Sequence, residues 1–423
     1  MHIADLKDHV GKEVELKGWV YRWRESKGIV FLVLRDVTGV VQCVIKGDAK
    51  DFKEAQKAKI ESSVILKGVV KEDKRGPGGY EIQITKLQLV GQSENFPIKE
   101  DASTEFLLDM RHLWVRSRRL TSIFKVRSDV FGAIHEFFRN GGFFEIQSPS
   151  ITASACEGGS TLFEVKYFDQ KAYLTQSWQL YAEAMIASLE KIYCIAPSFR
   201  AEKSRTRRHL AEYWHAEAEA AWMDHEANLK LQEELVFFVI QKVLKNREED
   251  LKFLERDIDF LKKIKLPFPR ITYTEAVKKL EKDGVAIKWG QDFGIDEEKI
   301  LTAHFKSPFF VTQYPKAIKA FYMKQDPKDP NLVLNDDMFA PEGYGEIIGG
   351  SEREVDVERV IQRLKAQGSS IKDYEWYLDI RKYGSVPHAG FGLGVERLVM
   401  WLCGLDHIRD TIAFPRVMNR VYP

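Results

Sequence analysis

Hydrophobic and polar residues alternate along the first ninety positions, with turn signals between the alternating runs. Alternation with a period of two is typical of strands that bury one face. The pattern predicts the order β-β-β-α-β-β, with a helix in AKDFKEAQKAKI and strands in EVELKGWVYRW, GIVFLVLRD, GVVQCVIK, SSVILKGVVKED and YEIQITKLQLVG. A five-stranded OB barrel has this order and commonly presents a strand face to single-stranded nucleic acid. We therefore expect an OB-fold β-barrel over residues 1–93.

The rest of the chain predicts a larger α+β domain over residues 119–423. Residues 94–118 carry mixed charge and little period, which indicates a connector. Phe124 to Asn140 has the pattern of an amphipathic helix that ends at a Gly-Gly pair, and the stretch FFEIQSPSI that follows reads as a strand halted by Pro149.

Two later stretches are less regular. Leu, Glu and Lys recur at helical spacing over residues 223–262, which predicts a surface helix region. The signals between residues 271 and 333 are mixed, so we expect an α/β insertion there, beginning around residue 255.

The run RTRRHLAEYWHAEAE places many cationic groups before regularly spaced carboxylates. Ala and Glu favour a helix, but Tyr213, His215, Glu217 and Glu219 have the period of a strand. We predict a strand that points all four side chains toward one side.

Composition narrows the class of protein. The chain has 423 residues and a net charge of +1, and residues 1–93 hold 17 Lys/Arg against 13 Asp/Glu, a local cationic excess that suits a polyanion. The four cysteines show no zinc or disulfide spacing, and we find neither a signal pattern nor an apolar run of membrane-spanning length. We expect a cytoplasmic protein with reduced thiols and no membrane partner.

Three segments carry the residue types of a nucleotide site. FRAEKSRTRRHLAEY suits a hairpin that offers guanidinium and imidazole donors to a polyphosphate, although a solvated basic loop has the same composition. In GFGLGVERLVMWL, glycines permit close backbone approach before a helix, or mark a structural bend. NDDMFAPEGYGEIIGGSERE offers Asp337 and Glu346 to Mg²⁺, although acidic loops are usually just solvated.

In their order, these segments resemble the class II aminoacyl-tRNA synthetases of the aspartyl/asparaginyl subgroup. FFEIQSPSI with Pro149 resembles motif 1, FRAE…RHLAEY resembles motif 2, and GLGVER resembles motif 3. The resemblance covers essentially the whole chain. It implies an antiparallel catalytic sheet flanked by helices, a homodimer formed through motif 1, and transfer of an amino acid to tRNA through an aminoacyl-adenylate.

The resemblance also assigns residues to ATP. It implies that Arg200 binds the α-phosphate, that Glu202 contacts ATP near the adenine, and that Tyr213 stacks under the adenine. His209 is implied at the terminal phosphate, with Arg208 beside it.

Motif 3 and the acidic segment complete the implied ATP site. Arg397 would cover the opposite face of the adenine and reach the γ-phosphate, with Gly394 beside it, and Asp337 and Glu346 would hold Mg²⁺. Whether Asp336 or Asp337 is the ligand stays open. Arg200 and Arg397 are the expected catalytic residues, and they would act by positioning and charge stabilisation.

The resemblance favours asparagine over aspartate as the substrate. Aspartyl enzymes typically have a lysine where this chain has Ala182, and a buried second carboxylate without that charge is costly. Arg353 is implied to donate to the substrate carbonyl and Glu217 to accept from its NH₂ group. Glu157 would hold the α-ammonium, with Gln179 lining the same cavity. From the residues alone, a structural salt bridge between Glu217 and an arginine is an alternative.

In the barrel, Phe31 and Gln42 match the family positions that stack on and hydrogen-bond to the central uridine of the anticodon. A phenylalanine in a strand is otherwise more often a core residue. The expected partners are tRNA, ATP and asparagine, and no DNA. Three alternatives stay open: an aspartyl-tRNA synthetase with relaxed tRNA choice, a synthetase-derived enzyme that makes asparagine, and a non-catalytic RNA-binding protein.

Overall fold

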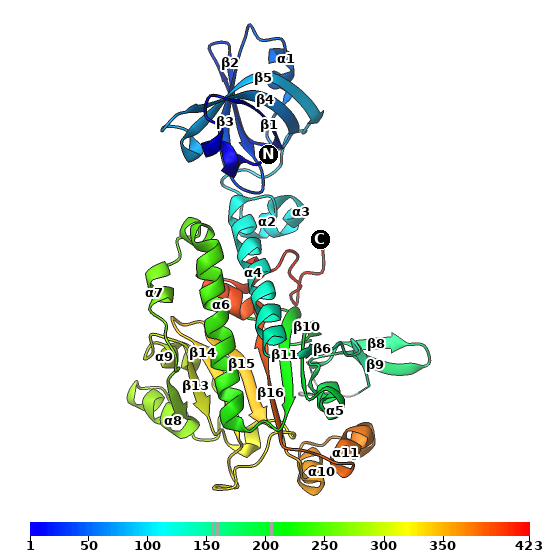
Figure 1. Ribbon diagram of the computed structural model, residues 1–423. Helices are drawn as coiled ribbons and strands as arrows, with labels where there is room; N and C mark the ends of the chain where they lie inside the picture. The colour runs from blue at the N-terminus through cyan, green and yellow to red at the C-terminus, as the bar shows by residue number, and fades with distance from the viewer. Residues whose placement is uncertain (154–155, 157–160, 204–205) are drawn as a thin grey trace. The chain divides into compact units, whose positions relative to one another are not determined.

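The computed structural model describes residues 1–153, 156, 161–203 and 206–423 (Figure 1). The chain forms two compact units, Met1–Trp114 and Val115–Pro423. Among the described residues, no helix is both long and apolar enough to span a membrane.

The first unit is a closed five-stranded barrel in the order β1-β2-β3-β5-β4. The barrel closes through the parallel pairing of β3 with β5, and the predicted order β-β-β-α-β-β is confirmed. Its elements are β1 (Glu13–Ser26), β2 (Ile29–Arg35), β3 (Val40–Lys46), α1 (Phe52–Lys57), β4 (Ser63–Glu72) and β5 (Tyr80–Gly91), with short 3-10 turns η1 (Ile3–Asp8) and η2 (Pro77–Gly79).

Side chains along the barrel strands alternate between the core and the outer face, as the sequence pattern predicts. Val30, Leu32 and Leu34 of β2 point into the core, because successive side chains of a strand face opposite sides. Phe31 is only half-buried on the outer face, so the alternative that it is a core residue is wrong.

The segment predicted as a connector, residues 94–118, contains two short helices. These are α2 (Thr104–Asp109) and α3 (Arg111–Trp114). The Ser103 hydroxyl accepts a hydrogen bond from the Phe106 N–H and so begins α2. The contact boundary between the units falls directly after α3.

The second unit is built on an eight-stranded sheet in the order β12-β13-β14-β15-β16-β11-β10-β6. The five central pairings are antiparallel, as expected, and the two outermost pairings are parallel. The strands are β6 (Phe144–Glu145), β10 (Lys191–Phe199), β11 (Glu212–Ala221), β12 (Arg270–Thr272), β13 (Phe309–Thr312), β14 (Asn335–Ala340), β15 (Gly345–Glu352) and β16 (His388–Gly394).

A smaller sheet and several helices complete this unit. The smaller sheet joins β7 (Ile151–Thr152), β9 (Gln170–Leu174) and β8 (Glu164–Tyr167) in that order. The longer helices α4 (Arg118–Asn140) and α6 (His225–Phe253) pack together and cross one face of the large sheet (Figure 1). The other elements are α5 (Gln179–Leu189), α7 (Ile258–Lys262), α8 (Tyr273–Lys282), α9 (Ile295–Thr302), η4 (Lys316–Ile318), α10 (Val357–Ala366), η5 (Ile371–Tyr374), α11 (Glu375–Lys382), α12 (Val395–Leu402) and η6 (Ile408–Thr411).

One sequence prediction for this unit needs correction. The stretch FFEIQSPSI is not one continuous strand: β10 pairs with it only at Phe144–Glu145, over Ile192 and Tyr193, and its last residue, Ile151, begins β7. Pro149 lies between these two short strands and has no N–H to donate. Helix α6 packs one side against the sheet and exposes the other side to solvent, as a surface helix does. The expected insertion supplies β12 and β13, which extend the main sheet.

Candidate active site

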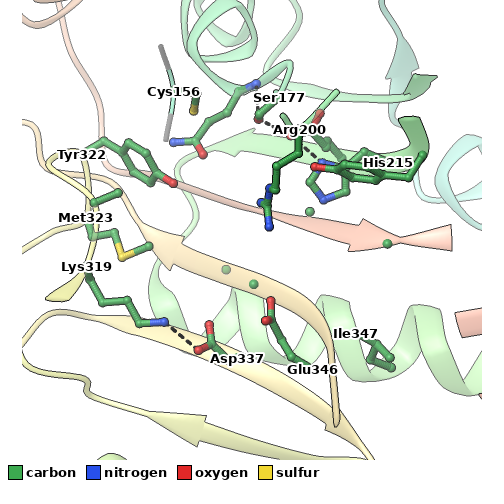
Figure 2. A pocket seen from close by; sticks show the side chains of 18 of the residues that line it. Cys156, Ser177, Arg200, His215, Lys319, Tyr322, Met323, Asp337, Glu346 and Ile347 are labelled. Atoms are coloured by element: carbon green, nitrogen blue, oxygen red, sulfur yellow. Dashed lines mark hydrogen bonds and ion pairs between the residues drawn. The ribbon is translucent and has the colours of Figure 1, made fainter. Parts of the chain in front are cut away.

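A cavity of about 670 Å³ lies in the second unit (Figure 2). Strand β11 contributes Tyr213, His215 and Glu217 to its lining, all from one face of the strand, while Ala216 and Ala218 lie buried on the other. The prediction of a strand with these polar side chains on one side is therefore confirmed. Its other lining residues with polar or charged side chains include Ser177, Gln179, Arg200, Arg208, His209, Lys319, Asp337, Glu346, Arg353, Glu396 and Arg397.

Cationic side chains gather at one end of this cavity. Arg200 follows β10 directly, and Arg397 stands in the first turn of α12, which begins after Gly394. The Nη1 atom of Arg397 lies 3.2 Å from Oε2 of Glu346 and also donates to the Glu346 carbonyl at 3.0 Å. Arg208 donates to Glu298 at 2.6 Å.

His209 lies among these arginines. Its Nδ1 atom is hydrogen-bonded to the Thr206 hydroxyl, and its Nε2 atom lies 3.9 Å from a carboxylate oxygen of Glu202. Burial lowers the pKa of His209 to about 4, and the charge of Arg397 adds to the effect. The imidazole is therefore neutral at neutral pH while the cavity is empty. Glu202 is the one residue implied at ATP, among those described, that does not line the cavity.

Two carboxylates from neighbouring strands face the cavity opposite Arg200 (Figure 2). Asp337 lies on β14 and Glu346 on β15, and Oδ1 of Asp337 and Oε1 of Glu346 each lie 3.6 Å from the point that a Cβ on Gly349 would occupy. Asp336 is on the other face of β14, where it bonds to Nε2 of His225 at 3.0 Å. Of the two aspartates, Asp337 is therefore the one that faces the cavity.

The second oxygen of each carboxylate has a cationic partner. Lys319 donates to Oδ2 of Asp337 at 2.7 Å, and Arg397 lies beside Oε2 of Glu346. Burial raises the pKa of Asp337 to about 7, with Lys319 opposing and Glu346 adding to the rise. Burial also raises the pKa of Glu346, but Arg397 and Lys319 outweigh burial and leave that pKa below its ordinary value.

Glu217 marks the other end of the cavity. It accepts hydrogen bonds from the Ser177 hydroxyl and, at 2.8 Å, from the backbone N–H of Trp178. Nδ1 of His215 lies 3.6 Å from Oε1 of Glu217, and no arginine among the described residues forms an ion pair with Glu217, so the alternative of a salt bridge to an arginine is wrong.

Arg353 also lines this end, and its guanidinium is held by hydrogen bonds to residues that do not line the cavity. Its Nε and Nη2 atoms donate to Glu219 at 2.9 and 2.8 Å, and Nη1 donates to the Ser351 hydroxyl at 2.7 Å. These bonds use three of the five N–H donors of a guanidinium. Glu219, which the strand pattern had pointed to this side, therefore orients Arg353.

Gln179 has a similar buried partner. Its Nε2 atom donates to Glu183 at 3.0 Å, and Glu183 also binds Arg381 and His388. Ala182, beside it in α5, is fully buried. The predicted ammonium ligand Glu157 lies outside the described residues.

Sequence analysis missed several of these groups. Lys319 comes from the segment in which no clear period was found, and no local signal marks it. Ser177 lies in the same stretch of the chain as Ala182, and its link to Glu217 depends on the pairing of distant segments.

The barrel carries the two residues expected to read the anticodon. Phe31 and Gln42 lie on the outer face of adjacent strands β2 and β3, where Phe31 pairs with Val44 and Gln42 with Val33. The guanidinium of Arg24 lies 4.2 Å from the centre of the Phe31 ring. Gln42 donates to Glu81 at 2.9 Å.

Comparison with known proteins identifies the class. Residues 103–418 match the family model of class II tRNA synthetases (D, K and N), and residues 14–90 match that of the OB-fold nucleic acid binding domain. The chain belongs to the class II tRNA synthetases.

Individual relatives narrow this class. The chain is 54% identical to the asparagine–tRNA ligase of Thermococcus gammatolerans and 50% identical to that of Desulforamulus reducens, covering 100% of this chain and 99% of each relative. Asparaginyl-tRNA synthetase from Pyrococcus horikoshii, solved with asparaginyl-adenylate, superposes with a TM-score of 0.97 at 50% identity, covering 100% of this chain and 99% of that chain. An aspartyl-tRNA synthetase from Entamoeba histolytica gives 0.88 at 27% identity, covering 100% and 92%. Within the class, the chain therefore belongs to the asparagine–tRNA ligase family.

Proposed function

We propose that this protein ligates asparagine to its tRNA in two steps, with ATP consumed to form asparaginyl-adenylate and pyrophosphate. The observation that carries the proposal is that an acceptor, Glu217, and a donor, Arg353, both line one end of a cavity whose other end is cationic. The full-length relatives with the same activity in their names support it.

The choice of asparagine follows from the charges at Glu217. A carboxylate that already accepts from Ser177 and Trp178 is held in place, and it presents only acceptor oxygens to a substrate. The carboxamide NH₂ of asparagine satisfies such an acceptor, whereas aspartate would place a second negative charge against it. Ala182 supplies no compensating charge. Mismatched polar groups of this kind discriminate by about 10⁴-fold or more in closed sites.

Adenylate formation requires that the α-phosphate lie in line with the substrate carboxylate. In this proposal Arg200 stabilises the charge that develops on the α-phosphate, because its side chain extends into the cavity opposite Asp337 and Glu346 (Figure 2). Tyr213 stacks on the adenine, and Arg397 covers its other face. His209, neutral in the empty cavity, faces the terminal phosphate beside Arg208.

Asp337 and Glu346 fit a hard divalent cation, since two carboxylate oxygens from adjacent strands converge over Gly349, where no side chain intervenes. Mg²⁺ held there would neutralise phosphate charge during the transfer.

We assign tRNA recognition to the outer face of the barrel. Phe31 offers a stacking surface and Gln42 a polar edge for an unstacked base. We also propose a cytoplasmic location, supported by the burial of all four cysteine side chains.

A homodimer formed through the segment of motif 1 is part of the proposal. Pro149 is exposed, and the side chain of Phe144 is 57% exposed at the end of the large sheet. A second copy would cover this edge.

The test is charging of purified asparagine tRNA with labelled asparagine and, in parallel, with labelled aspartate. We expect charging with asparagine alone. Charging with aspartate at a comparable rate would contradict the assignment of Glu217. Pyrophosphate exchange without any charging would indicate that the barrel does not present tRNA to the site.

A further inference from the structure

The two carboxylates at Gly349 each have one oxygen directed to a cationic side chain and one to the cavity. Lys319 takes Oδ2 of Asp337 and Arg397 takes Oε2 of Glu346, while Oδ1 and Oε1 converge over Gly349. When Asp337 and Glu346, which we call the carboxylate pair, are both ionised, Lys319 and Arg397 supply two positive charges against their two negative ones.

Lys319 is fixed in this position. Its side chain is 13% exposed, as is that of Asp337, and its ammonium also lies 3.9 Å from the centre of the Tyr314 ring. The lysine is held between a carboxylate and an aromatic face, which strengthens the contact when both are desolvated. Figure 2 shows its side chain extended along the wall of the cavity toward Asp337.

The consequence concerns a free divalent cation. Lys319 and Arg397 already neutralise the charges of Asp337 and Glu346. A divalent metal ion that entered the cavity without a nucleotide would therefore add two positive charges. The site is partly buried, so these charges would be weakly screened. A nucleotide triphosphate brings enough negative charge to reverse this balance. The carboxylate oxygens are therefore placed for the metal, but the electrostatic balance admits it only together with the nucleotide.

We propose that Lys319 makes metal binding conditional on the nucleotide. The charge of Lys319 prevents Asp337 and Glu346 from binding a free divalent cation, so the metal enters only as the metal–ATP complex. This inference rests on the proposed function, because it takes Asp337 and Glu346 as the residues that hold the metal.

The test measures binding of Mn²⁺, by the loss of its free-ion electron paramagnetic resonance signal, with and without ATP at pH 8. We expect the wild-type protein to bind Mn²⁺ weakly alone and tightly with ATP. Lys319→Met should bind free Mn²⁺ at least about tenfold more tightly than wild type, because one opposing charge is removed. Lys319→Arg should restore wild-type behaviour, and Lys328→Met, which removes an exposed lysine of the same segment, should leave it unchanged.

Two results would overturn the inference: free Mn²⁺ binding by Lys319→Met within twofold of wild type, or wild-type binding of free Mn²⁺ as tight as with ATP. Asp337→Asn separates this inference from its premise. If that variant keeps wild-type Mn²⁺ binding in the presence of ATP, the metal is not at Asp337, and the assignment of the metal site fails instead. Circular dichroism of each variant establishes that it is folded.

Discussion

Replacing Glu217 by glutamine removes one negative charge from the cavity and keeps the shape of the side chain. In the native protein the carboxylate accepts from the Ser177 hydroxyl and from the Trp178 N–H. A glutamine side chain has one acceptor oxygen and one NH₂ donor, so it cannot accept on both sides. The substitution therefore disturbs either the wall of the pocket or the group offered to the substrate.

The size of the effect follows from these bonds. A hydrogen bond to a charged group contributes about 1.5–3 kcal/mol, which corresponds to about 10- to 150-fold in kcat/KM for asparagine. For aspartate the change has the opposite sign, because the substrate no longer meets a carboxylate of like charge. We expect the ratio of kcat/KM for asparagine to that for aspartate to fall by about 10² or more.

The assay is ATP–pyrophosphate exchange with each amino acid, and the KM for ATP serves as an internal reference because Glu217 lies away from the cationic end. Glu212→Gln is a matched control, since Glu212 is on the same strand but does not line the cavity. An unchanged ratio of the two amino acids, or an equal loss in the KM for ATP, would refute the role assigned to Glu217.

Four further outcomes are expected. Arg200→Ala should lower the rate of pyrophosphate exchange about 10²- to 10³-fold with the oligomeric state unchanged in size-exclusion chromatography; retained exchange would remove Arg200 from the mechanism. Phe31→Ala should raise the KM for tRNA about 5- to 150-fold and leave pyrophosphate exchange unaltered, which charging kinetics will check. Gly392→Ala should destabilise the protein by about 1–3 kcal/mol in urea unfolding, because its Cβ would lie 2.5 Å from Nε2 of His215. The pKa of His209 is lowered to about 4 in the folded state, so the unfolded state takes up a proton more readily. The free energy of unfolding therefore falls as the pH drops from about 6.5 toward 4. His209→Asn should lose less stability than wild type between pH 7 and 5 in the same urea assay.

Much of the barrel and of strand β11 is predictable because the information is local. Alternation between polar and apolar residues fixes which residues of a strand share a face: Tyr213, His215 and Glu217 all line the cavity from one face of β11. The stretch around Phe144 shows where local information ends. Its pattern favours a strand, but a strand requires a partner, and within this chain β10 supplies one for only two residues.

The contacts inside the cavity depend on pairing between distant segments, which periodicity does not report. Arg353 meets Glu219 because β15 and β11 both pair with β16, and the chain separates the two residues by more than a hundred positions. Lys319 reaches Asp337 from an irregular segment with no period at all. Family motifs identify residues that line the cavity. The residues that hold them in place, such as Glu219, are identified only from the structure.

Buried residues that contact the lining of the cavity fix the orientation of the polar groups that it offers to a ligand. Gln179 has its Nε2 atom fixed on Glu183, a carboxylate that can only accept, so the carbonyl oxygen of Gln179 is turned the other way. Burial alone raises the pKa of Glu183, but Arg381 and His388 outweigh burial and keep the pKa below its ordinary value, so this acceptor persists across the physiological range. Because the orientation is set before the substrate arrives, a ligand with the wrong donor or acceptor meets a group that cannot rotate to accommodate it. The orientation of polar groups in the cavity thus depends on buried ion pairs that do not line it.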